Sequence, residues 1–171
     1  MLAAATIVLW LLGRPGTVSR WRIASASALA SAGLALLVNQ VISHLWERPR
    51  PTVAHPDAHL YFVAPSADPS FPSDHAAASF AIAVAVFLVS RRVGVAFLVA
   101  ALAIGLARVL IGLHYPGDIA AGALVGLGSA MAVHHLARRP LTSVVRAVGR
   151  ATDLLLTPLW RMAERARARG R

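Results

Sequence analysis

Hydrophobic residues along the chain fall into five runs, which cover about residues 1–12, 23–46, 75–89, 93–113 and 119–136. A helix needs about 20 apolar residues to cross the hydrocarbon core of a membrane. The first run is too short to cross, and the third and fifth are close to the lower limit. The pattern predicts an all-α, polytopic membrane helix bundle with four full spans and a short N-terminal apolar helix.

The connections between the runs alternate in charge. Of the 17 arginines, 14 lie within residues 14–22, 91–92 and 138–171, and the other connections hold only Arg48, Arg50 and Arg108. Arginine-rich loops concentrate on the cytoplasmic side of a membrane. We therefore predict a bacterial cytoplasmic (inner) membrane protein whose remaining polar segments face the extracytoplasmic side. Topology and anionic membrane lipid explain the formal net charge of +10, so no nucleic-acid partner is expected.

Composition agrees with this assignment. The chain is 57% hydrophobic and 14% charged, whereas soluble domains are about 25% charged. The absence of cysteine excludes disulfides and thiolate metal sites. We divide the chain into a partial N-terminal apolar helix with its basic loop (1–22), a catalytic transmembrane bundle (23–137) and a basic amphipathic cytoplasmic tail (138–171). The tail is expected to lie on the inner leaflet as helix broken at Pro158.

Three short polar blocks stand at the edges of the hydrophobic runs, at residues 48–51, 72–75 and 108–118. Arginine and histidine are costly at a membrane edge, so each block is a candidate functional segment. The arginine counting places all three on one side of the membrane. Together they supply guanidinium groups, two histidines, a serine and a carboxylate, which suits binding a phosphate and breaking a P–O bond.

The second block reads Pro72-Ser73-Asp74-His75 and precedes an alanine-rich run. Proline and serine at that place predict a helix start, where free N–H groups and the helix dipole form an anion site. Ser73 could add a hydroxyl donor, with His75 at the rim of the site. The alternative is that Ser73 or Asp74 only caps the helix.

The third block joins Arg108, His114 and Asp118. A carboxylate four residues after a histidine can bind one imidazole nitrogen, fix the tautomer and raise the basicity of the other nitrogen. Such a pair makes a nucleophile or a base. The alternative is an interfacial His–Asp pair that only locks the turn.

The first block, Arg48-Pro49-Arg50-Pro51, ends the second hydrophobic run. Guanidinium groups match phosphate oxygens in pairs, so Arg48 and Arg50 are candidate phosphate ligands. The alternative is that both arginines reach to lipid headgroups.

The three blocks resemble the signature of the type 2 phosphatidic acid phosphatases. The second block matches at Pro72, Ser73 and His75, and the third matches at Arg108, His114 and Asp118, with Ala107 in place of a serine. The first matches at Arg50-Pro51, with Ser43 in place of a lysine. The doubled Arg-Pro, the run from Ser70 to Ala76 and the His-Tyr-Pro are most similar to the bacitracin-resistance branch, which consists of undecaprenyl-diphosphate phosphatases.

The resemblance implies a phosphatidic acid phosphatase type 2/haloperoxidase-like core and hydrolysis of undecaprenyl diphosphate to undecaprenyl phosphate. It implies that His114, oriented by Asp118, forms a phosphohistidine, and that His75 is the acid and then the base. Residues expected to hold the phosphoryl group are Arg50, Arg108 and Ser73, with Arg48 as a substitute for the missing lysine. Neither cofactor nor metal is expected.

Other interpretations stay open. The substrate could be another lipid phosphate, such as phosphatidylglycerophosphate, phosphatidate or another prenyl phosphate. A transporter or scaffold without enzymatic activity could use the arginines to bind anionic lipid. A soluble vanadate-type haloperoxidase shares the three blocks, but the long apolar runs argue against it.

Three further features lie outside the blocks. Asn39 could bond between helices or line a lipid groove. Gly122 and Gly126 are spaced for close helix packing within the chain. The histidines and aspartate at residues 55–59 have a spacing that suits a metal, but without a fourth ligand we expect none.

Overall fold

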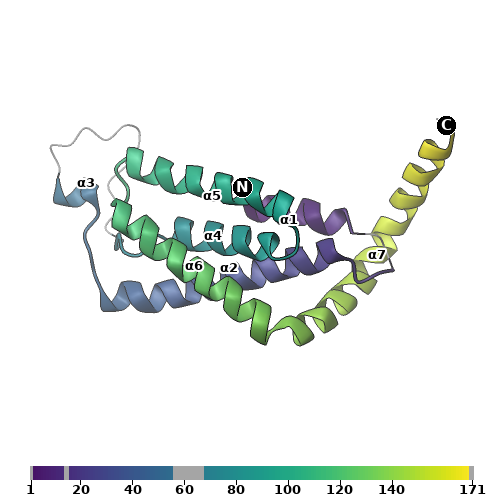
Figure 1. Cartoon of the computed structure of the whole chain (residues 1–171), viewed down its shortest axis with the longest axis horizontal. Coiled ribbons are helices and arrows are strands. Elements are labelled where there is room, and N and C mark those ends of the chain that lie inside the picture. Colours follow the sequence, from purple (N-terminus) through teal and green to yellow (C-terminus); the bar gives the residue numbers. More distant parts are fainter. Residues whose placement is uncertain (1, 14–15, 56–67, 170–171) are drawn as a thin grey trace.

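The computed structural model describes residues 2–13, 16–55 and 68–169, and these contain helices and no strands. The helices are α1 (Leu2–Leu11), α2 (Arg20–Leu45), α3 (Pro51–Ala54), α4 (Asp74–Phe87), α5 (Arg91–Leu110), α6 (Pro116–Leu136) and α7 (Arg138–Arg169). In Figure 1, α2, α4, α5 and α6 run along the long axis, α1 covers one end of this bundle, and α7 extends beyond the same end. The all-α prediction is confirmed.

Three of the helices, α2, α5 and α6, are long and apolar enough to cross a membrane. The protein is thus a multi-pass membrane protein. The predicted fourth span, α4, has 14 residues, which corresponds to about 21 Å, whereas the hydrocarbon core is about 30 Å thick. It packs against α2, α5 and α6, and Figure 1 shows it in their midst, beginning further inside the bundle than α6. Its polar first turn is therefore recessed between longer helices.

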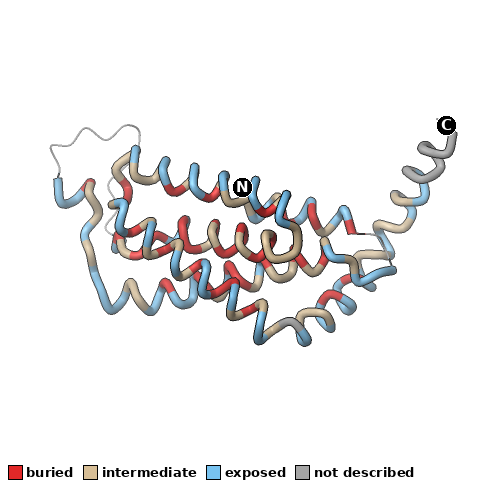
Figure 2. The backbone as a smooth tube through the Cα atoms, viewed as in Figure 1, coloured by how far each residue is buried: buried red, intermediate tan, exposed pale blue. Residues whose placement is uncertain are grey.

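Small residues allow α6 to lie directly against α4. A Cβ atom at Gly122 would come within 2.6 Å of the Ser73 carbonyl oxygen, and one at Gly126 within 2.5 Å of the Ala77 carbonyl oxygen. Only glycine fits such an approach, so the predicted packing within the chain is confirmed. The buried core is mostly alanine, and Figure 2 shows the buried positions on the faces that the helices turn toward one another.

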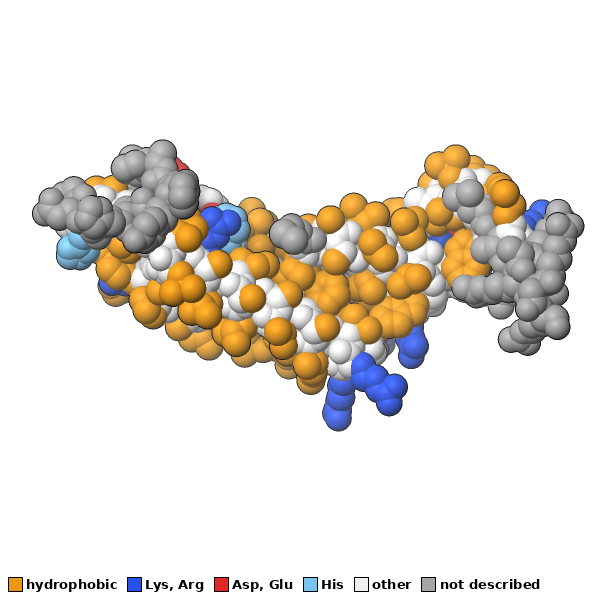
Figure 3. Space-filling view, turned by 90° about the horizontal axis from the view of Figure 1, so that it is seen from above, with side chains coloured by type: hydrophobic (Ala, Val, Ile, Leu, Met, Phe, Trp, Pro, Cys, Tyr) orange, Lys and Arg blue, Asp and Glu red, His pale blue; other side chains and the backbone are white. Residues whose placement is uncertain are grey.

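Large hydrophobic side chains cover the outside of the bundle. Leu37, Leu102, Leu106 and Leu124 are all exposed, as lipid-facing residues are in a membrane protein. Figure 3 shows hydrophobic side chains along the body, with histidine and arginine toward its left end and arginines protruding from its lower edge right of the centre. This distribution fits a bundle with its long axis across the membrane.

The prediction that Pro158 breaks the tail is wrong. Pro158 lies inside α7, which is one helix from Arg138 to Arg169. A proline removes one backbone hydrogen bond and bends a helix without having to end it. Figure 1 shows α7 changing direction along its length. Next to the proline, the Thr157 hydroxyl donates to the Asp153 carbonyl oxygen at 2.6 Å.

Candidate active site

The topology brings the three polar blocks to one end of the bundle. The last turns of α2 and α5 and the first turns of α4 and α6 meet there, beside α3, and α7 lies at the opposite end (Figure 1). We call these the block end and the tail end. At the block end, Arg48 of the first block bonds directly to Asp118 of the third block, 70 residues later in the sequence.

The start of α4 is held by Ser73. Its side chain caps the helix by accepting from the Ala76 N–H at 3.5 Å, and its own N–H donates to the Asp118 carbonyl oxygen at 3.1 Å. Ser73 is fully buried, whereas His75, the second residue of the helix, is exposed. The helix start is thus confirmed, and its cap is bound to the third block.

The turn between α5 and α6 places His114. Gly112 has a φ of 72°, which glycine adopts without strain. The chain then folds back, so that the N–H groups of Leu113 and His114 both donate to the Arg108 carbonyl oxygen, at 3.0 and 3.3 Å. Arg108 and His114 are therefore linked through the backbone of one compact turn.

The imidazole of His114 is buried and bonded to Ser70. Its Nδ1 lies 2.8 Å from the Ser70 carbonyl oxygen, and 3.8 Å from Oδ2 of Asp118. A carbonyl oxygen can only accept, so Nδ1 carries the proton, and in the neutral ring Nε2 is the free lone pair. The expected His114–Asp118 pair is thus a close contact at 3.8 Å, and the hydrogen bond that orients the ring is the one that Nδ1 donates to the Ser70 carbonyl oxygen.

Asp118 collects donors from three segments. Its Oδ2 accepts from the Ser70 hydroxyl at 2.6 Å and from the Tyr115 N–H at 2.8 Å, and its Oδ1 accepts from Nη1 of Arg48 at 3.0 Å. The carboxylate is fully buried. A buried charge is stable only when it is paired and hydrogen-bonded. Asp118 therefore organises the loops around His114.

Arg48 is the residue of the first block that reaches the third block. Besides its bond to Asp118, its guanidinium lies 3.9 Å from the centre of the Tyr115 ring, and its carbonyl oxygen accepts from the Ser70 N–H at 2.8 Å. Arg50 instead bonds to the loop before α4, with its Nε donating to the Asp68 carbonyl oxygen at 3.0 Å. The two arginines of the block thus have different surroundings.

Burial lowers the pKa of His114 below its ordinary value of 6.5. The Ser70 carbonyl opposes this shift, Arg50 adds to it, Asp118 opposes it, and His75 adds to it. His114 is therefore neutral at pH 7. Arg50 and Arg108 also lie within electrostatic range of His75, so the predicted arginines and both histidines surround one region.

A polar cavity of about 460 Å³ lies beside this region. Ser43, at the position of the expected lysine, lines this cavity together with Arg50. The opposite wall includes Pro72 and Asp74 from the start of α4. The cavity therefore lies next to the recessed first turn of α4.

A family model described as the PAP2 superfamily matches residues 24–140. The chain belongs to the PAP2 superfamily. It is 34% identical over 125 residues to "Undecaprenyl-diphosphatase BcrC" of Bacillus subtilis (strain 168), covering 73% of this chain and 62% of that protein. It is 33% identical over 132 residues to "Bacitracin transport permease protein BcrC" of Bacillus licheniformis, covering 77% and 63%.

A third relative is "Putative undecaprenyl-diphosphatase YbjG" of Escherichia coli (strain K12), at 35% identity over 123 residues, covering 71% of this chain and 59% of that protein. The chain thus spans about three fifths of the length of the curated relatives it matches. The PAP2 match begins within α2 and ends within α7, so it includes every residue of the candidate site.

Two residues of this PAP2 site had no role in the sequence-based interpretation. Ser70 acts through its backbone carbonyl and its hydroxyl, and Tyr115 through its ring and N–H. Backbone contacts leave no signal in the residue type. The only signal was that Ser70 and Tyr115 lie inside the runs that carry the family resemblance.

Asn39 bonds between helices, which was one of the two interpretations. It is buried in α2, and its Nδ2 donates to the Pro72 carbonyl oxygen at 3.0 Å and to Oδ1 of Asp74 at 2.6 Å. It therefore fixes the start of α4 against α2. Of the discounted metal candidates, Asp57 and His59 lie outside the described residues.

Proposed function

We propose that this protein is a lipid phosphatase that hydrolyses undecaprenyl diphosphate to undecaprenyl phosphate on the extracytoplasmic face of the bacterial cytoplasmic membrane. The observation that carries the proposal is the hydrogen bond from Nδ1 of His114 to the Ser70 carbonyl oxygen. It leaves Nε2 as an unprotonated lone pair on a neutral ring, as a nucleophile requires.

In the proposed first step, Nε2 of His114 attacks the terminal phosphorus and the bond from that phosphorus to the bridging oxygen breaks. Arg50, Arg108 and the N–H groups of the first turn of α4 stabilise the charge on the phosphoryl oxygens. Protonated His75 donates its proton to the departing lipid phosphate. The product is a phosphohistidine on His114. Because arginines supply the positive charge, this step requires no metal.

In the second step, His75, now neutral, takes a proton from a water molecule that attacks the phosphohistidine. The P–N bond breaks, inorganic phosphate leaves, and His114 returns to its neutral form. The Asp118 carboxylate, 3.8 Å from Nδ1, stabilises the imidazolium character that develops on His114 during both steps.

The names of the relatives support the substrate. Two carry the name undecaprenyl-diphosphatase, and another, "Decaprenylphosphoryl-5-phosphoribose phosphatase" of Mycobacterium tuberculosis, is named for a different polyprenyl lipid. A polyprenyl phosphate is therefore the lipid class that we propose. The arginine distribution supports the placement of the site on the extracytoplasmic face.

The test is phosphate release by the purified full chain in detergent, with undecaprenyl diphosphate, phosphatidate and phosphatidylglycerophosphate offered separately. We expect fastest release from undecaprenyl diphosphate and a loss of at least about 10³-fold in His114→Ala. His135→Ala, an exposed histidine at the tail end of α6, is the matched control and should keep full activity.

Two results would redirect the proposal. Faster release from a glycerolipid would change the substrate and keep the chemistry. Release that is absent, or unchanged in His114→Ala, would instead favour a transporter or scaffold without enzymatic activity; the Bacillus licheniformis relative is named a bacitracin transport permease protein.

A further inference from the structure

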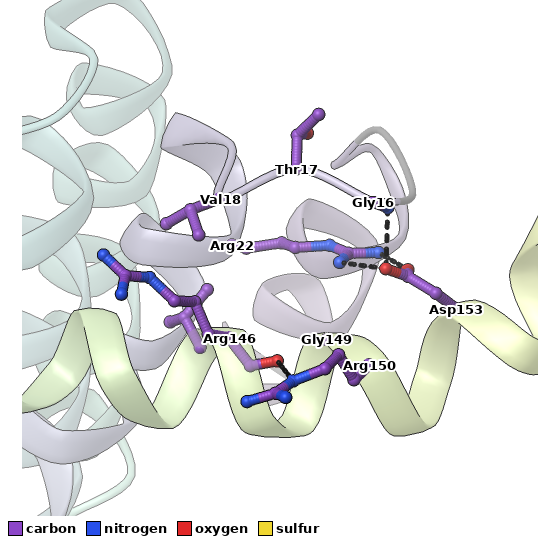
Figure 4. Close-up of a pocket in the computed structure, with 9 residues that line it drawn as sticks. Gly16, Thr17, Val18, Arg22, Arg146, Gly149, Arg150 and Asp153 are labelled. Atoms are coloured by element: carbon purple, nitrogen blue, oxygen red, sulfur yellow. Dashed lines mark hydrogen bonds and ion pairs between the residues drawn. The ribbon is translucent and has the colours of Figure 1, made fainter.

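We propose that the tail end of the bundle holds a second binding site, which takes the phosphate of an anionic lipid headgroup. The site is a cavity of about 290 Å³ between the α1–α2 connection, the first turn of α2 and the middle of α7. Figure 4 shows its residues, among them Gly16, Arg22, Arg146, Arg150 and Asp153. It lies at the other end of the molecule from His114 and is independent of the proposed hydrolysis.

Arg22 forms the back of this cavity and is 1% exposed. Glycines flank it: a Cβ atom at Gly13 would come within 2.6 Å of its Cγ, and one at Gly149 within 2.9 Å of its Nη1. In Figure 4 its side chain extends across the cavity to Asp153. The guanidinium is thus held in a fixed orientation by backbone on both sides.

Asp153 bonds to Arg22 and to the Gly16 N–H, not to the other two arginines of the cavity. Its Oδ1 accepts from Nη2 of Arg22, and its Oδ2 accepts from Nη1 of Arg22 at 3.2 Å and from the Gly16 N–H at 2.7 Å. Three arginines share this cavity with one aspartate, which leaves a formal charge of +2. The cavity is therefore electropositive although it contains an ion pair.

Two arginine Nε groups of the cavity lack a strong hydrogen bond to the protein. Nε of Arg22 is buried and has no hydrogen-bond partner among residues 2–13, 16–55 and 68–169. Arg146 and Arg150 are exposed, and Figure 4 shows both guanidinium groups on the side away from Asp153. Nε of Arg150 makes only a long contact, 3.4 Å, to the Arg146 carbonyl oxygen. Because Nε of Arg22 is buried, the donors available to a bound oxyanion are the exposed guanidinium groups of Arg146 and Arg150.

The chemistry of the cavity points to phosphate, and its surroundings point to lipid. Guanidinium groups match phosphate oxygens in pairs, and basic pockets between membrane helices bind lipid headgroups. On α7, Leu154 is exposed near Arg150, and Val144, Val148 and Leu155 are exposed on the opposite side of the helix, as in amphipathic helices that lie at a membrane interface. We therefore expect the cavity to lie at headgroup level, with the apolar side of α7 toward the acyl chains.

The experiment uses the full chain in detergent and measures its thermal midpoint and, by native mass spectrometry, its bound lipid. The probes are phosphatidylglycerol, zwitterionic phosphatidylcholine and inorganic phosphate. The test variant is Arg146→Ala/Arg150→Ala, and the matched control is Arg91→Ala/Arg92→Ala, which removes the same charge from exposed residues at the same end of the bundle. Since all four residues are exposed, both variants should fold.

We expect phosphatidylglycerol to raise the midpoint by about 5 °C and phosphatidylcholine to raise it much less. The test variant should lose this rise and bind phosphatidylglycerol about tenfold more weakly, whereas the control should keep both. Equal losses in the two variants, or no rise with phosphatidylglycerol, would overturn the proposal. An equal rise with inorganic phosphate would overturn the lipid as the source of the phosphate.

Discussion

Each end of the bundle has an Arg–Asp pair that joins distant segments, and the two pairs are buried in opposite ways. At the block end, Asp118 is 0% exposed and its partner Arg48 is 39% exposed. At the tail end, Arg22 is 1% exposed and its partner Asp153 is 17% exposed. The same ion pair thus has a buried carboxylate at one end and a buried guanidinium at the other.

The buried member shows what each pair does. Asp118 accepts three hydrogen bonds from segments that surround His114, so the pair fixes the geometry of a site. Arg22 extends from the bundle to a residue 131 positions later, so that pair holds α7 against the bundle. One pair is therefore expected to affect chemistry, and the other stability.

The strongest test of these different roles replaces each aspartate with asparagine, which has the same shape and no charge. In Asp118→Asn, the side-chain amide group points at least one N–H toward a group that also donates, and the negative charge beside His114 is lost. We therefore expect kcat to fall by about 10³-fold. Asp153→Asn should leave kcat within about twofold. The measurement is phosphate release from undecaprenyl diphosphate, with thermal midpoints to confirm folding. Equal losses of kcat would refute the division of roles.

At the tail end the larger effect should come from the buried partner. Arg22→Ala empties the space between Gly13 and Gly149 and leaves Asp153 with only the Gly16 N–H, and we expect a loss of about 3 kcal/mol in stability. Arg20→Ala removes an exposed charge two residues away and should cost less than about 0.5 kcal/mol. Thermal melting measures both. Faster tryptic cleavage within α7 of Arg22→Ala, with kcat unchanged, would show that the tail has detached.

Arg48 and Arg50 provide a test within the block end. Arg48 is bound to Asp118 and stacked on Tyr115, so Arg48→Ala should lower kcat by about 10- to 50-fold with little change in KM, and Arg48→Lys should recover part of the loss. Arg50→Ala should mainly raise KM. The opposite pattern, in which Arg48→Ala raises KM alone, would make Arg48 the phosphate ligand that its sequence position suggests.

The hydrophobic pattern predicted the helices because their lengths follow from crossing a membrane. Differences arose at the ends: α2 begins at Arg20 and not near residue 23, because the Ser19 side chain caps it by accepting from the Arg22 N–H. Alternating charge also predicted that the three blocks would share one end. That inference depends only on whether the number of membrane crossings between two connections is even or odd. It therefore holds although α4 is shorter than a full span.

The contacts inside the site could not be predicted in the same way. The partner of His114 is a backbone carbonyl, which any residue at position 70 would supply. The choice between Arg48 and Arg50 depends on how the chain leaves α2, and the pairing of Arg22 with Asp153 depends on where α7 returns. Spacing within a block is local information, whereas each of these contacts joins segments whose approach only the fold determines.

The two ends should also differ in their response to pH. The pKa of His114 is lowered from 6.5, so the acid limb of kcat/KM should lie below pH 6.5 once the ionisation of the substrate is subtracted. Arg50→Ala removes a cation that lowers this pKa, so it should move the limb to higher pH. An acid limb above 6.5 would contradict a neutral, buried His114 as nucleophile.

The Arg22 bond lowers the pKa of Asp153 from its ordinary value of 3.8. The stabilisation from this carboxylate is therefore complete above the unfolded value and is lost as pH falls through the lowered folded value. Between about pH 5 and 8 the cleavage of α7 by protease should thus not change. If the cleavage of α7 does change within that pH range, another titrating group at the tail end must control the contact between α7 and the bundle.

The smallest effect is expected where this chain departs from its family's pattern. Ser43 lines the cavity with Arg50, and among the described residues its hydroxyl bonds the Gln40 carbonyl oxygen, at 3.0 Å, so Ser43→Ala should change neither kcat nor KM. Ser43→Lys adds a cation beside Arg50, but Glu47 and Asp74 line the same cavity and partly neutralise it. We expect KM to fall by about threefold with kcat unchanged, since exposed charge pairs contribute little. A larger fall would mean that the missing lysine limits phosphate binding here, and a rise would mean that the cavity holds an uncharged part of the substrate.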